Sequence, residues 1–214
     1  MKQRIILVGG GGHCRACIDV IEADGKFEVS GIVDVEEKMG QRVLGYETIA
    51  CDEDLSKLAK EYEYFLVTLG QIKSADKRMD KFEYLKNLGA KFPVVVSPSA
   101  YVSKSASVGE GTIVMHRAVV NANATVGKNC IVNTGATVEH DTRIGDHCHI
   151  STGGIVNGGC SIGEKTFVGS NSVIANNTSI AEGTIIGAGS VVVNSVNESG
   201  VYAGNPIGKL SENA

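Results

Sequence analysis

The chain has 214 residues and a formal net charge of -4, so it can form one large domain or two small ones. The acidic balance argues against nucleic acid or an anionic membrane surface as the main partner. No apolar run is long enough to span a bilayer, and the first one breaks into glycine at residue 9, unlike a signal peptide. We therefore expect a cytoplasmic protein without membrane insertion.

The first 90 residues alternate between strand-like and helix-like segments. Strands are predicted over residues 4–8, 27–34 and 64–69. Helices are predicted over 13–23, over 52–62 with Asp52 as N-cap, and over 74–89, closing at Gly89. This alternation predicts a Rossmann-like α/β domain with a small parallel sheet over residues 1–92.

From residue 102 the sequence repeats every six residues. Reading each sixth position from Val102 to Val192 gives sixteen consecutive β-branched aliphatic residues, and the residue four places further on is small in every hexad but the last. No helix or ordinary strand has this period, whereas a β-helix of hexapeptide repeats does. Residues 93–214 are therefore predicted to form a β-helix of about five coils with three hexads each, followed by a C-terminal tail.

The residue before each inward aliphatic faces outward, which gives three columns along the coil. One is polar: Ser107, Thr125, Arg143, Ser161 and Ser179. The other two are mostly apolar: Ile113, Ile131, His149, Phe167 and Ile185, and Tyr101, Val119, Thr137, Ile155, Val173 and Val191. Long apolar stripes are rarely left uncovered, so we expect both faces to be buried against neighbouring subunits in a closed ring of three.

The cysteines are predicted to be reduced packing residues. Cys130, Cys148 and Cys160 all occupy the small corner position of a hexad. Cys14 and Cys17 form a C-x-x-C motif, for which a redox pair is one interpretation and two small helix residues one turn apart is the favoured one.

Two of the five histidines are candidates for function. His140 is flanked one coil away on either side by Ala122 and Gly158, so its ring has room. Asp141 directly after it can fix the tautomer of a general base, the alternative being a turn aspartate with a local backbone bond. His149 interrupts an apolar column, which is costly unless the side chain serves a purpose.

The remaining coil histidines, His116 and His147, are predicted to be solvated surface residues. A zinc site is disfavoured, because the spacing of His140, His147 and His149 differs from that of the trimeric β-helix carbonic anhydrases. We therefore expect no metal.

Motifs in both halves carry a family resemblance: "VGGGGHC", "VTLGQIKSADKR", "NTGATVEHD", "GDHCHIS" and "VYAGNPIGK". With them the chain resembles the sugar O- and N-acyltransferases of the left-handed β-helix class over nearly its whole length. It is most similar to the bacterial nucleotide-aminosugar N-acetyltransferases of bacillosamine-type pathways, and the sialic acid O-acetyltransferases are near relatives.

This resemblance implies a left-handed coil, acetyl-CoA as co-substrate, and a homotrimer with active sites between subunits. It implies that His140 is the general base and that Asp141 orients it. The other roles implied in the coil are contact with substrate for Asn133, a place near the acetyl group or the amino sugar for His149, an oxyanion-binding amide for Gly158, and CoA contacts for Gly187, Ala188 and Lys209.

The N-terminal half is expected to hold the nucleotide sugar. The run from Gly9 through Gly11 and Gly12 to His13 ends a strand and opens a helix, where free backbone N–H groups favour phosphate. A tight glycine turn is the alternative, and the run lacks the G-x-G-x-x-G pattern of a dinucleotide site. The remaining pocket residues are expected to follow the second and third strands: Asp34, Gly70 and Gln71.

The function expected from these features is acetyl-CoA-dependent N-acetylation of the 4-amino group of a UDP- or GDP-linked 4-amino-4,6-dideoxy sugar. The alternatives are a sialic-acid-type O-acetyltransferase, a non-catalytic nucleotide-sugar-binding or scaffold protein, and a hexapeptide carbonic anhydrase.

Overall fold

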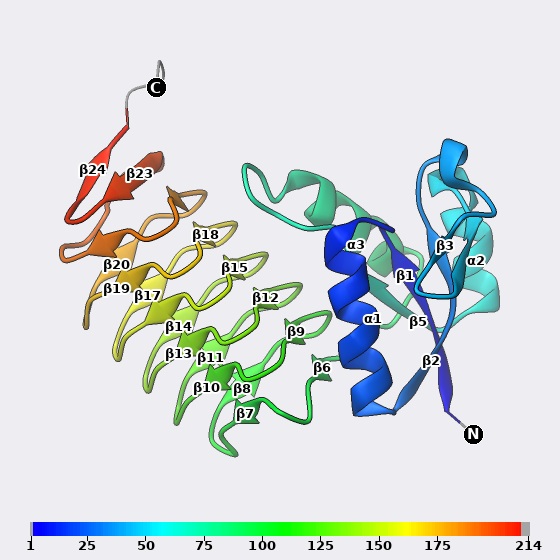
Figure 1. Cartoon of the computed structure of the whole chain (residues 1–214), viewed down its shortest axis with the longest axis horizontal. Helices are drawn as coiled ribbons and strands as arrows, with labels where there is room; N and C mark the ends of the chain where they lie inside the picture. Colours follow the sequence, from blue (N-terminus) through cyan, green and yellow to red (C-terminus); the bar gives the residue numbers. More distant parts are fainter. Residues whose placement is uncertain (1, 211–214) are drawn as a thin grey trace.

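The computed structural model describes residues 2–210, so the last four residues of the predicted tail, 211–214, lie outside it. An α/β domain and a long coil lie side by side in Figure 1. The α/β domain has a five-stranded sheet with the order β3-β4-β2-β1-β5. Strands β1 (Gln3–Val8), β2 (Phe27–Val33) and β5 (Tyr64–Val67) are parallel, as predicted.

Helices cover both faces of this sheet. Alternate residues of β1 point to opposite faces, so Ile5 and Leu7 pack with α1 (Gly12–Asp24), while Ile6 and Val8 pack with α2 (Leu55–Glu61) and α3 (Asp76–Asn87). Short 3₁₀ turns cover Glu36–Lys38 and Asp52–Asp54. The predicted N-cap at Asp52 is wrong, because the Asp54 carboxylate accepts a hydrogen bond from the Cys51 backbone N–H at 3.2 Å instead.

A hairpin that was not predicted from the sequence forms the edge of the sheet. Strand β3 (Arg42–Val43) pairs antiparallel with β4 (Tyr46–Ala50), which itself pairs parallel with β2. Leu44 and Gly45 form the turn with φ angles of 49° and 90°. A leucine at the first of these left-handed positions is unusual, so the two-residue turn lacked the usual Asn-Gly or Asp-Gly signal.

The second domain is a left-handed parallel β-helix, which confirms the hexapeptide prediction. Its three faces are sheets of two-residue strands, and the last two strands of the chain extend one of these sheets. Face A holds β6 (Val95–Val96), β9 (Ile113–Val114), β12 (Ile131–Val132), β15 (His149–Ile150), β18 (Phe167–Val168), β21 (Ile185–Ile186), β23 (Val201–Gly204) and β24 (Ile207–Lys209). Face B holds β7 (Tyr101–Val102), β10 (Val119–Val120), β13 (Thr137–Val138), β16 (Ile155–Val156), β19 (Val173–Ile174) and β22 (Val191–Val192). Face C holds β8 (Ser107–Val108), β11 (Thr125–Val126), β14 (Arg143–Ile144), β17 (Ser161–Ile162) and β20 (Ser179–Ile180).

The coil repeats every 18 residues without interruption. Val120 pairs with Val138 and Val138 with Val156, so each inward aliphatic stacks on its counterpart one coil away. Nearly all of the inward aliphatics are buried in one core, together with the three coil cysteines, as expected. Four glycines that each follow an inward aliphatic also repeat every 18 residues, and a Cβ on any of them would lie 2.4–2.7 Å from a backbone atom of the next coil: Gly109, Gly127, Gly145 and Gly163.

The α/β domain packs against the beginning of face A. Ile113 and Ile131 point outward from this face, yet both are fully buried in a cluster with Cys17 and Ile21 of α1. The expectation that neighbouring subunits bury this whole face is therefore wrong for its first coils, because the chain's own N-terminal domain covers them. Face B carries no such cover from residues 2–210, and its Tyr101 is 58% exposed.

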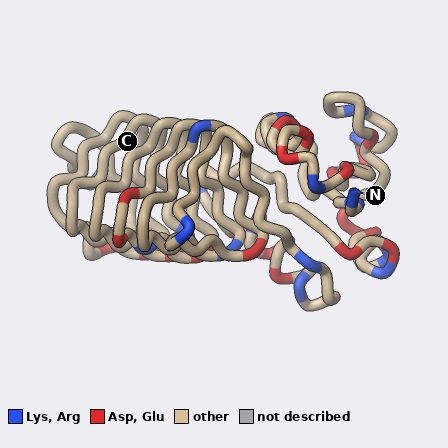
Figure 2. Tube along the Cα trace, turned by 90° about the horizontal axis from the view of Figure 1, so that it is seen from below, with Lys and Arg blue, Asp and Glu red and all other residues tan. Residues whose placement is uncertain are grey.

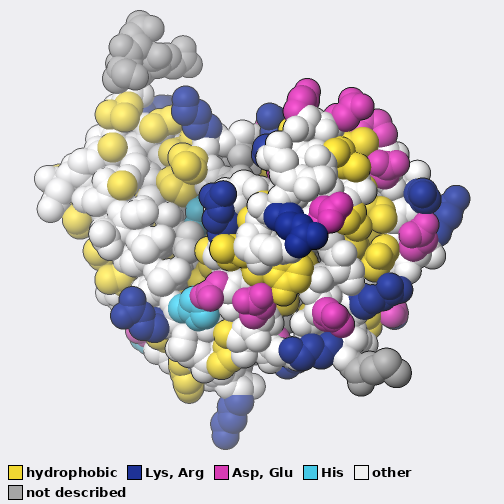
Figure 3. Space-filling model, turned by 45° about the vertical axis from the view of Figure 1, so that its right-hand side comes forward, with side chains coloured by type: hydrophobic (Ala, Val, Ile, Leu, Met, Phe, Trp, Pro, Cys, Tyr) yellow, Lys and Arg dark blue, Asp and Glu magenta, His cyan; other side chains and the backbone are white. Residues whose placement is uncertain are grey.

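Charge is distributed unevenly between the two domains. In Figure 2 the coil is mostly uncharged, while acidic and basic residues gather in the α/β domain and along one side of the coil. On the face shown in Figure 3, acidic and basic side chains alternate over the α/β domain without one extended basic patch. Within residues 2–210, no helix combines the length and apolar character needed to cross a membrane.

Candidate active site

The predicted base lies at the edge where faces B and C meet. His140 occupies the turn between β13 and β14, and its Nδ1 lies 2.8 Å from Oδ2 of Asp141. Asp141 takes a left-handed backbone conformation with φ 59°, which brings its carboxylate alongside the ring. Its other oxygen accepts a 2.7 Å hydrogen bond from Nδ2 of Asn123, one coil earlier.

The carboxylate fixes the tautomer of His140. Hydrogen bonds from Asn123 and His140 lower the pKa of Asp141, so at neutral pH it accepts the hydrogen on Nδ1. This leaves Nε2 with a free lone pair, as a general base requires. Asn123 was not among the predicted site residues, although its separation of 18 residues from Asp141 places the two in adjacent coils.

Gly158 lies directly against this free nitrogen. A Cβ at position 158 would be 2.6 Å from both Nε2 and Cε1 of His140, so the ring occupies the space that any side chain would need. The Gly158 amide donates to no acceptor within residues 2–210. A proton acceptor and a free N–H therefore lie next to each other at this corner.

A second group of predicted residues lies on face A, against the α/β domain. His149 is only 6% exposed, and its Nδ1 lies 2.7 Å from the backbone oxygen of Gln71 in the loop between β5 and α3. Because a carbonyl only accepts, Nδ1 carries the hydrogen, and Nε2 accepts a 3.0 Å bond from Nδ2 of Asn133. Burial lowers the pKa of His149 to about 4, so the ring is neutral at physiological pH.

His13 lies beside this pair, at the start of α1. Its ring centroid is 6.4 Å from that of His149, and a Cβ at Gly70 would lie 3.6 Å from its own Cβ. Burial, followed by the charge of Arg78 and the proximity of His149, lowers the pKa of His13 to about 3. The first turn of α1 and the β5–α3 loop thus meet at the two neutral rings.

The glycine turn divides into structural and open positions. Gly9 has φ 108° and its N–H is bonded to the Val33 oxygen at 2.8 Å, so it serves the close approach of β1 to Leu69. Gly11 and Gly12 are exposed, and a Cβ on either would contact nothing within 4 Å. The space for an anion at the N-terminus of α1 is therefore at Gly11 and Gly12.

Asp34 lies at the end of β2 and lines a pocket of about 410 Å³ together with Gly9 and Leu69. Its carboxylate accepts bonds from Gly10 N–H at 2.9 Å and from Lys38 Nζ at 2.8 Å. Burial opposes its ionisation, but these bonds and that from Val35 outweigh it and lower the pKa of Asp34. The pocket opens at the carboxyl ends of parallel strands, the usual place for ligands in such sheets.

A buried cation that was not predicted from the sequence lies at the junction of the domains. Arg78 of α3 is 1% exposed, and its guanidinium donates to the backbone oxygens of Val67, of Leu69 at 3.0 Å and of Asn129 at 3.3 Å. Nη2 of Arg78 and the side-chain Nε2 and Oε1 of Gln71 are buried without partners within residues 2–210. The apolar spacing of α3 offered no signal for this, since an arginine on a helix is normally solvated.

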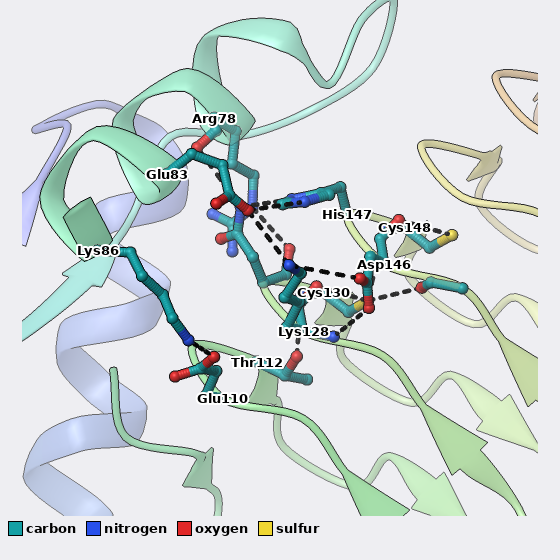
Figure 4. A network of polar contacts seen from close by, with 12 residues as sticks. Arg78, Glu83, Lys86, Glu110, Thr112, Lys128, Cys130, Asp146, His147 and Cys148 are labelled. Atoms are coloured by element: carbon teal, nitrogen blue, oxygen red, sulfur yellow. Dashed lines mark hydrogen bonds and ion pairs between the residues drawn. The ribbon is translucent and has the colours of Figure 1, made fainter. Parts of the chain in front are cut away.

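Figure 4 shows the junction around Arg78. The prediction that His147 is solvated is wrong: it is 4% exposed and accepts a 3.0 Å bond from Asn129 Nδ2, with Glu83 of α3 at 3.7 Å. Burial lowers the pKa of His147. Lys86 of α3 pairs with Glu110 at the same junction.

His116 lies partly exposed at the surface, and its ring also joins the two domains. Its Nε2 lies 2.7 Å from Oδ2 of Asp19 on α1, and its Nδ1 lies 2.6 Å from Oγ of the buried Ser97. His116, His147 and His149 each connect the coil to a different segment of the α/β domain. A single sequence cannot indicate such contacts, because the partners are far apart along the chain. His149 and Gln71 are separated by 78 residues, and His116 and Asp19 by 97.

The residues expected to bind CoA lie further along the coil and differ in availability. The Gly187 N–H is bonded to the Tyr202 oxygen at 2.8 Å and its carbonyl to Ser172 Oγ at 2.7 Å, so its backbone is occupied. Ala188 is exposed, and its N–H donates to nothing within residues 2–210. Lys209 lines a groove of about 470 Å³ and is paired with Glu198 at 3.0 Å. The free amide of Ala188 fits an extended ligand arm better than Gly187 does.

The structure therefore brings the predicted residues together in two groups. His140, Asp141 and Gly158 share the edge between faces B and C, while His13, Gly70, Gln71, Asn133 and His149 share the junction on face A. In a triangular coil this edge lies opposite face A. Within residues 2–210 no three His, Cys, Asp or Glu side chains are grouped as metal ligands.

Comparison with known families gives matches in both domains. The PglD N-terminal domain matches residues 4–82, and the bacterial transferase hexapeptide family (six repeats) matches residues 159–194. A comparison with curated protein sequences gives no match.

Three solved structures illustrate the similarity. PerB from Caulobacter crescentus, in complex with CoA and GDP-perosamine, is 32% identical with a TM-score of 0.90, covering 97% of each chain. The acetyltransferase domain of PglB from Neisseria gonorrhoeae, in complex with acetyl coenzyme A, is 32% identical with a TM-score of 0.91, covering 98% of this chain and 100% of that one. WeeI from Acinetobacter baumannii, at 22% identity and a TM-score of 0.84, shares the fold over 98% of this chain and 100% of its own. With an α/β domain of the PglD type, a hexapeptide coil and these full-length similarities, the chain belongs to the family of hexapeptide-repeat sugar acetyltransferases.

Proposed function

We propose that the protein transfers the acetyl group of acetyl-CoA to the 4-amino group of a nucleotide-linked 4-amino-4,6-dideoxy sugar. The observation that carries the proposal is the arrangement of His140, held by Asp141 with its free Nε2 against the backbone of Gly158. The similarity to PerB, whose structure contains CoA and GDP-perosamine, supports a nucleotide-linked amino sugar as acceptor.

The chemistry follows from these three residues. Nε2 of His140 takes a proton from the sugar amine as its nitrogen forms a bond to the thioester carbonyl carbon. The negative charge on the carbonyl oxygen is stabilised by the free Gly158 N–H. When the carbon–sulfur bond breaks, the proton held by His140 passes to the departing thiolate of CoA. Asp141 stabilises the protonated ring between these steps. Because the amine attacks the thioester directly, no covalent enzyme intermediate forms.

The acceptor is held by the other group of residues. The open amides of Gly11 and Gly12 and the pocket at Asp34 suit a diphosphate and its nucleoside. Because this pocket lies on the face A side of the chain and His140 on the opposite edge, one chain alone does not bring acceptor and base together. We propose that the chains form a trimer in which face B of one copy packs against its neighbour, so that the base of one copy meets the nucleotide sugar held by the next.

CoA is assigned to the groove between copies, near the free amide of Ala188. Gly187 supports the groove through close packing, since a Cβ there would lie 2.9 Å from that of Ala203. Lys209 reaches a phosphate only by giving up its pair with Glu198.

The test is an acetyl-CoA assay against a panel of UDP- and GDP-linked 4-amino-4,6-dideoxy sugars, with release of the CoA thiol as the readout. We expect turnover with at least one acceptor and loss of most of it in His140→Ala, with folding and nucleotide binding retained. An active His140→Ala variant disproves the base assignment. Absence of thiol release with every amino sugar in the panel disproves the proposed reaction.

A further inference from the structure

The C-x-x-C motif at the start of α1 has no part in the reaction proposed above. Both of its cysteines are fully buried, and the Cys17 thiol contacts His13 of the proposed site. Its Sγ lies 3.4 Å from Nε2 of His13, one helical turn earlier. Burial raises the pKa of the Cys17 thiol, so the sulfur keeps its hydrogen at neutral pH and can donate it.

The neutral ring of His13 can accept this hydrogen at Nε2. Because burial, Arg78 and His149 keep the ring neutral, it carries one hydrogen, on Nδ1 or on Nε2. A thiol that donates to Nε2 leaves that hydrogen on Nδ1. Within residues 2–210, Nδ1 of His13 has no hydrogen-bond partner, which leaves a neutral donor available.

His13 lies close to the proposed binding site of the phosphate groups. It follows the open glycines at the N-terminus of α1 and lies beside Gly70 of the β5–α3 loop. The Gln71 side-chain amide at the same junction is 3% exposed and has no hydrogen-bond partner in the described residues. Buried polar groups are normally paired, so this amide is available to bind a ligand. Phosphate oxygens are acceptors only, so they bind the Nδ1–H form of the ring and repel the lone pair of the other tautomer.

We propose that Cys17 is a positioning residue, which holds His13 in the Nδ1–H tautomer so that the ring donates to a phosphate oxygen of the nucleotide sugar. The inference rests on the proposed function for the identity of the ligand. It assigns the second cysteine of the motif a polar role without redox chemistry. It also separates His13 from His140, since the first acts as a fixed donor and the second as a base.

The tautomer is measured directly by ¹⁵N NMR of the free protein with labelled histidine, His13 being assigned with His13→Gln. We expect His13 in the Nδ1–H form in the wild type and in Cys17→Ser, whose hydroxyl also donates. Cys17→Ala removes the donor, so a mixture of tautomers is expected. Cys14→Ala is the matched control, because it removes a buried thiol of the same helix that forms no hydrogen bond with the ring. A wild-type ring in the Nε2–H form overturns the proposal, as does an unchanged tautomer in Cys17→Ala.

The consequence for the ligand is measured by calorimetry with UDP and GDP. We expect Cys17→Ala to bind the preferred nucleotide about fivefold more weakly, which is the effect of one hydrogen bond. Cys17→Ser and Cys14→Ala are expected to stay within about twofold of the wild type. Equal binding by Cys17→Ala and the wild type overturns the proposal. If the wild type binds neither nucleotide, the proposed function fails, and the tautomer measurement decides the contact between Cys17 and His13 separately.

Discussion

Nδ1 of His149 lies 2.7 Å from the backbone oxygen of Gln71, which ties the middle of the coil to the β5–α3 loop of the α/β domain. The same ring accepts a bond from Asn133, so both nitrogens are satisfied by neutral partners. This explains the polar interruption of an apolar column: His149 is the hydrogen-bonding centre of the domain junction. It also makes the junction sensitive to protonation of the ring.

We expect this sensitivity to appear as a loss of stability in acid. The pKa of His149 is about 4 in the folded chain against a usual value of 6.5, so the unfolded chain binds the proton first. The contribution of the neutral His149 ring to the free energy of unfolding is complete above pH 6.5. It is lost as the pH falls towards 4, and the total loss is on the order of 3 kcal/mol. Urea unfolding at pH 7.5 and 4.5 measures this. The difference in unfolding free energy between wild type and His149→Gln is expected to shrink at the lower pH, and a constant difference contradicts the assignment.

Gly158→Ala tests the contact between the base and the oxyanion site. The new Cβ would meet Nε2 and Cε1 of His140 at 2.6 Å, so the ring must swing away. The His140 side chain is 58% exposed and can move without disturbing the core. We expect kcat to fall at least about tenfold with a nearly unchanged melting temperature. Full activity in this variant would falsify the placement of Gly158 in the active site.

Asn123→Ala tests the support of the carboxylate. Loss of the 2.7 Å bond to Asp141 frees the side chain that orients His140, and the pKa of Asp141 moves back towards its usual range. We expect a roughly threefold to tenfold lower kcat, milder than His140→Ala. The matched control is Asn121→Ala, since Asn121 donates to Glu139 at 2.8 Å in the same pair of coils and does not contact Asp141. Equal losses in both variants would show that the effect does not depend on the bond between Asn123 and Asp141.

Ile155→Lys tests the proposed packing of face B. Ile155 points outward from β16 in a half-exposed position, and its neighbours along the face are Thr137 and Val173. A lysine there places a charge in the proposed subunit interface, so we expect dissociation to monomers and loss of activity at micromolar concentration. Light scattering gives the mass. Ser161→Lys on polar face C is the control and is expected to leave the assembly intact, whereas an intact trimer in Ile155→Lys would place the interface elsewhere.

The coil could be predicted almost completely from the sequence because its rule is local. Each hexad repeats the same inward aliphatic and small corner residue, so the position of Val138 or Cys148 follows from residues six and eighteen places away. The pairing of His140 with Asp141 is equally local, since the two are adjacent. Resemblance to a family supplied the handedness of the coil, on which the repeat itself is silent.

The junction of the domains could not be predicted, because its contacts join distant segments. His147 occupies a turn position that would be solvated in an isolated coil, and only the packing of Phe82 and Glu83 of α3 against it changes this. Arg78 is buried by the same docking. The hairpin at Leu44 was missed for a different reason, since its turn residues do not have the composition that the turn type prefers.

Because the 18-residue repeat is uninterrupted, the coil can be shortened or lengthened without changing its faces only by whole coils. The glycines from Gly109 to Gly163 allow the backbone of each turn to rest on the next, with neighbouring strands about 4.8 Å apart. Removing one hexad would rotate everything beyond it by a third of a turn, and would move the free amide of Ala188 to a different face. Removing three hexads would keep every face in place and shorten the distance from His140 to the end of the coil by one step. In this architecture, the length of coil along which the long arm of a donor molecule can lie changes only by whole coils.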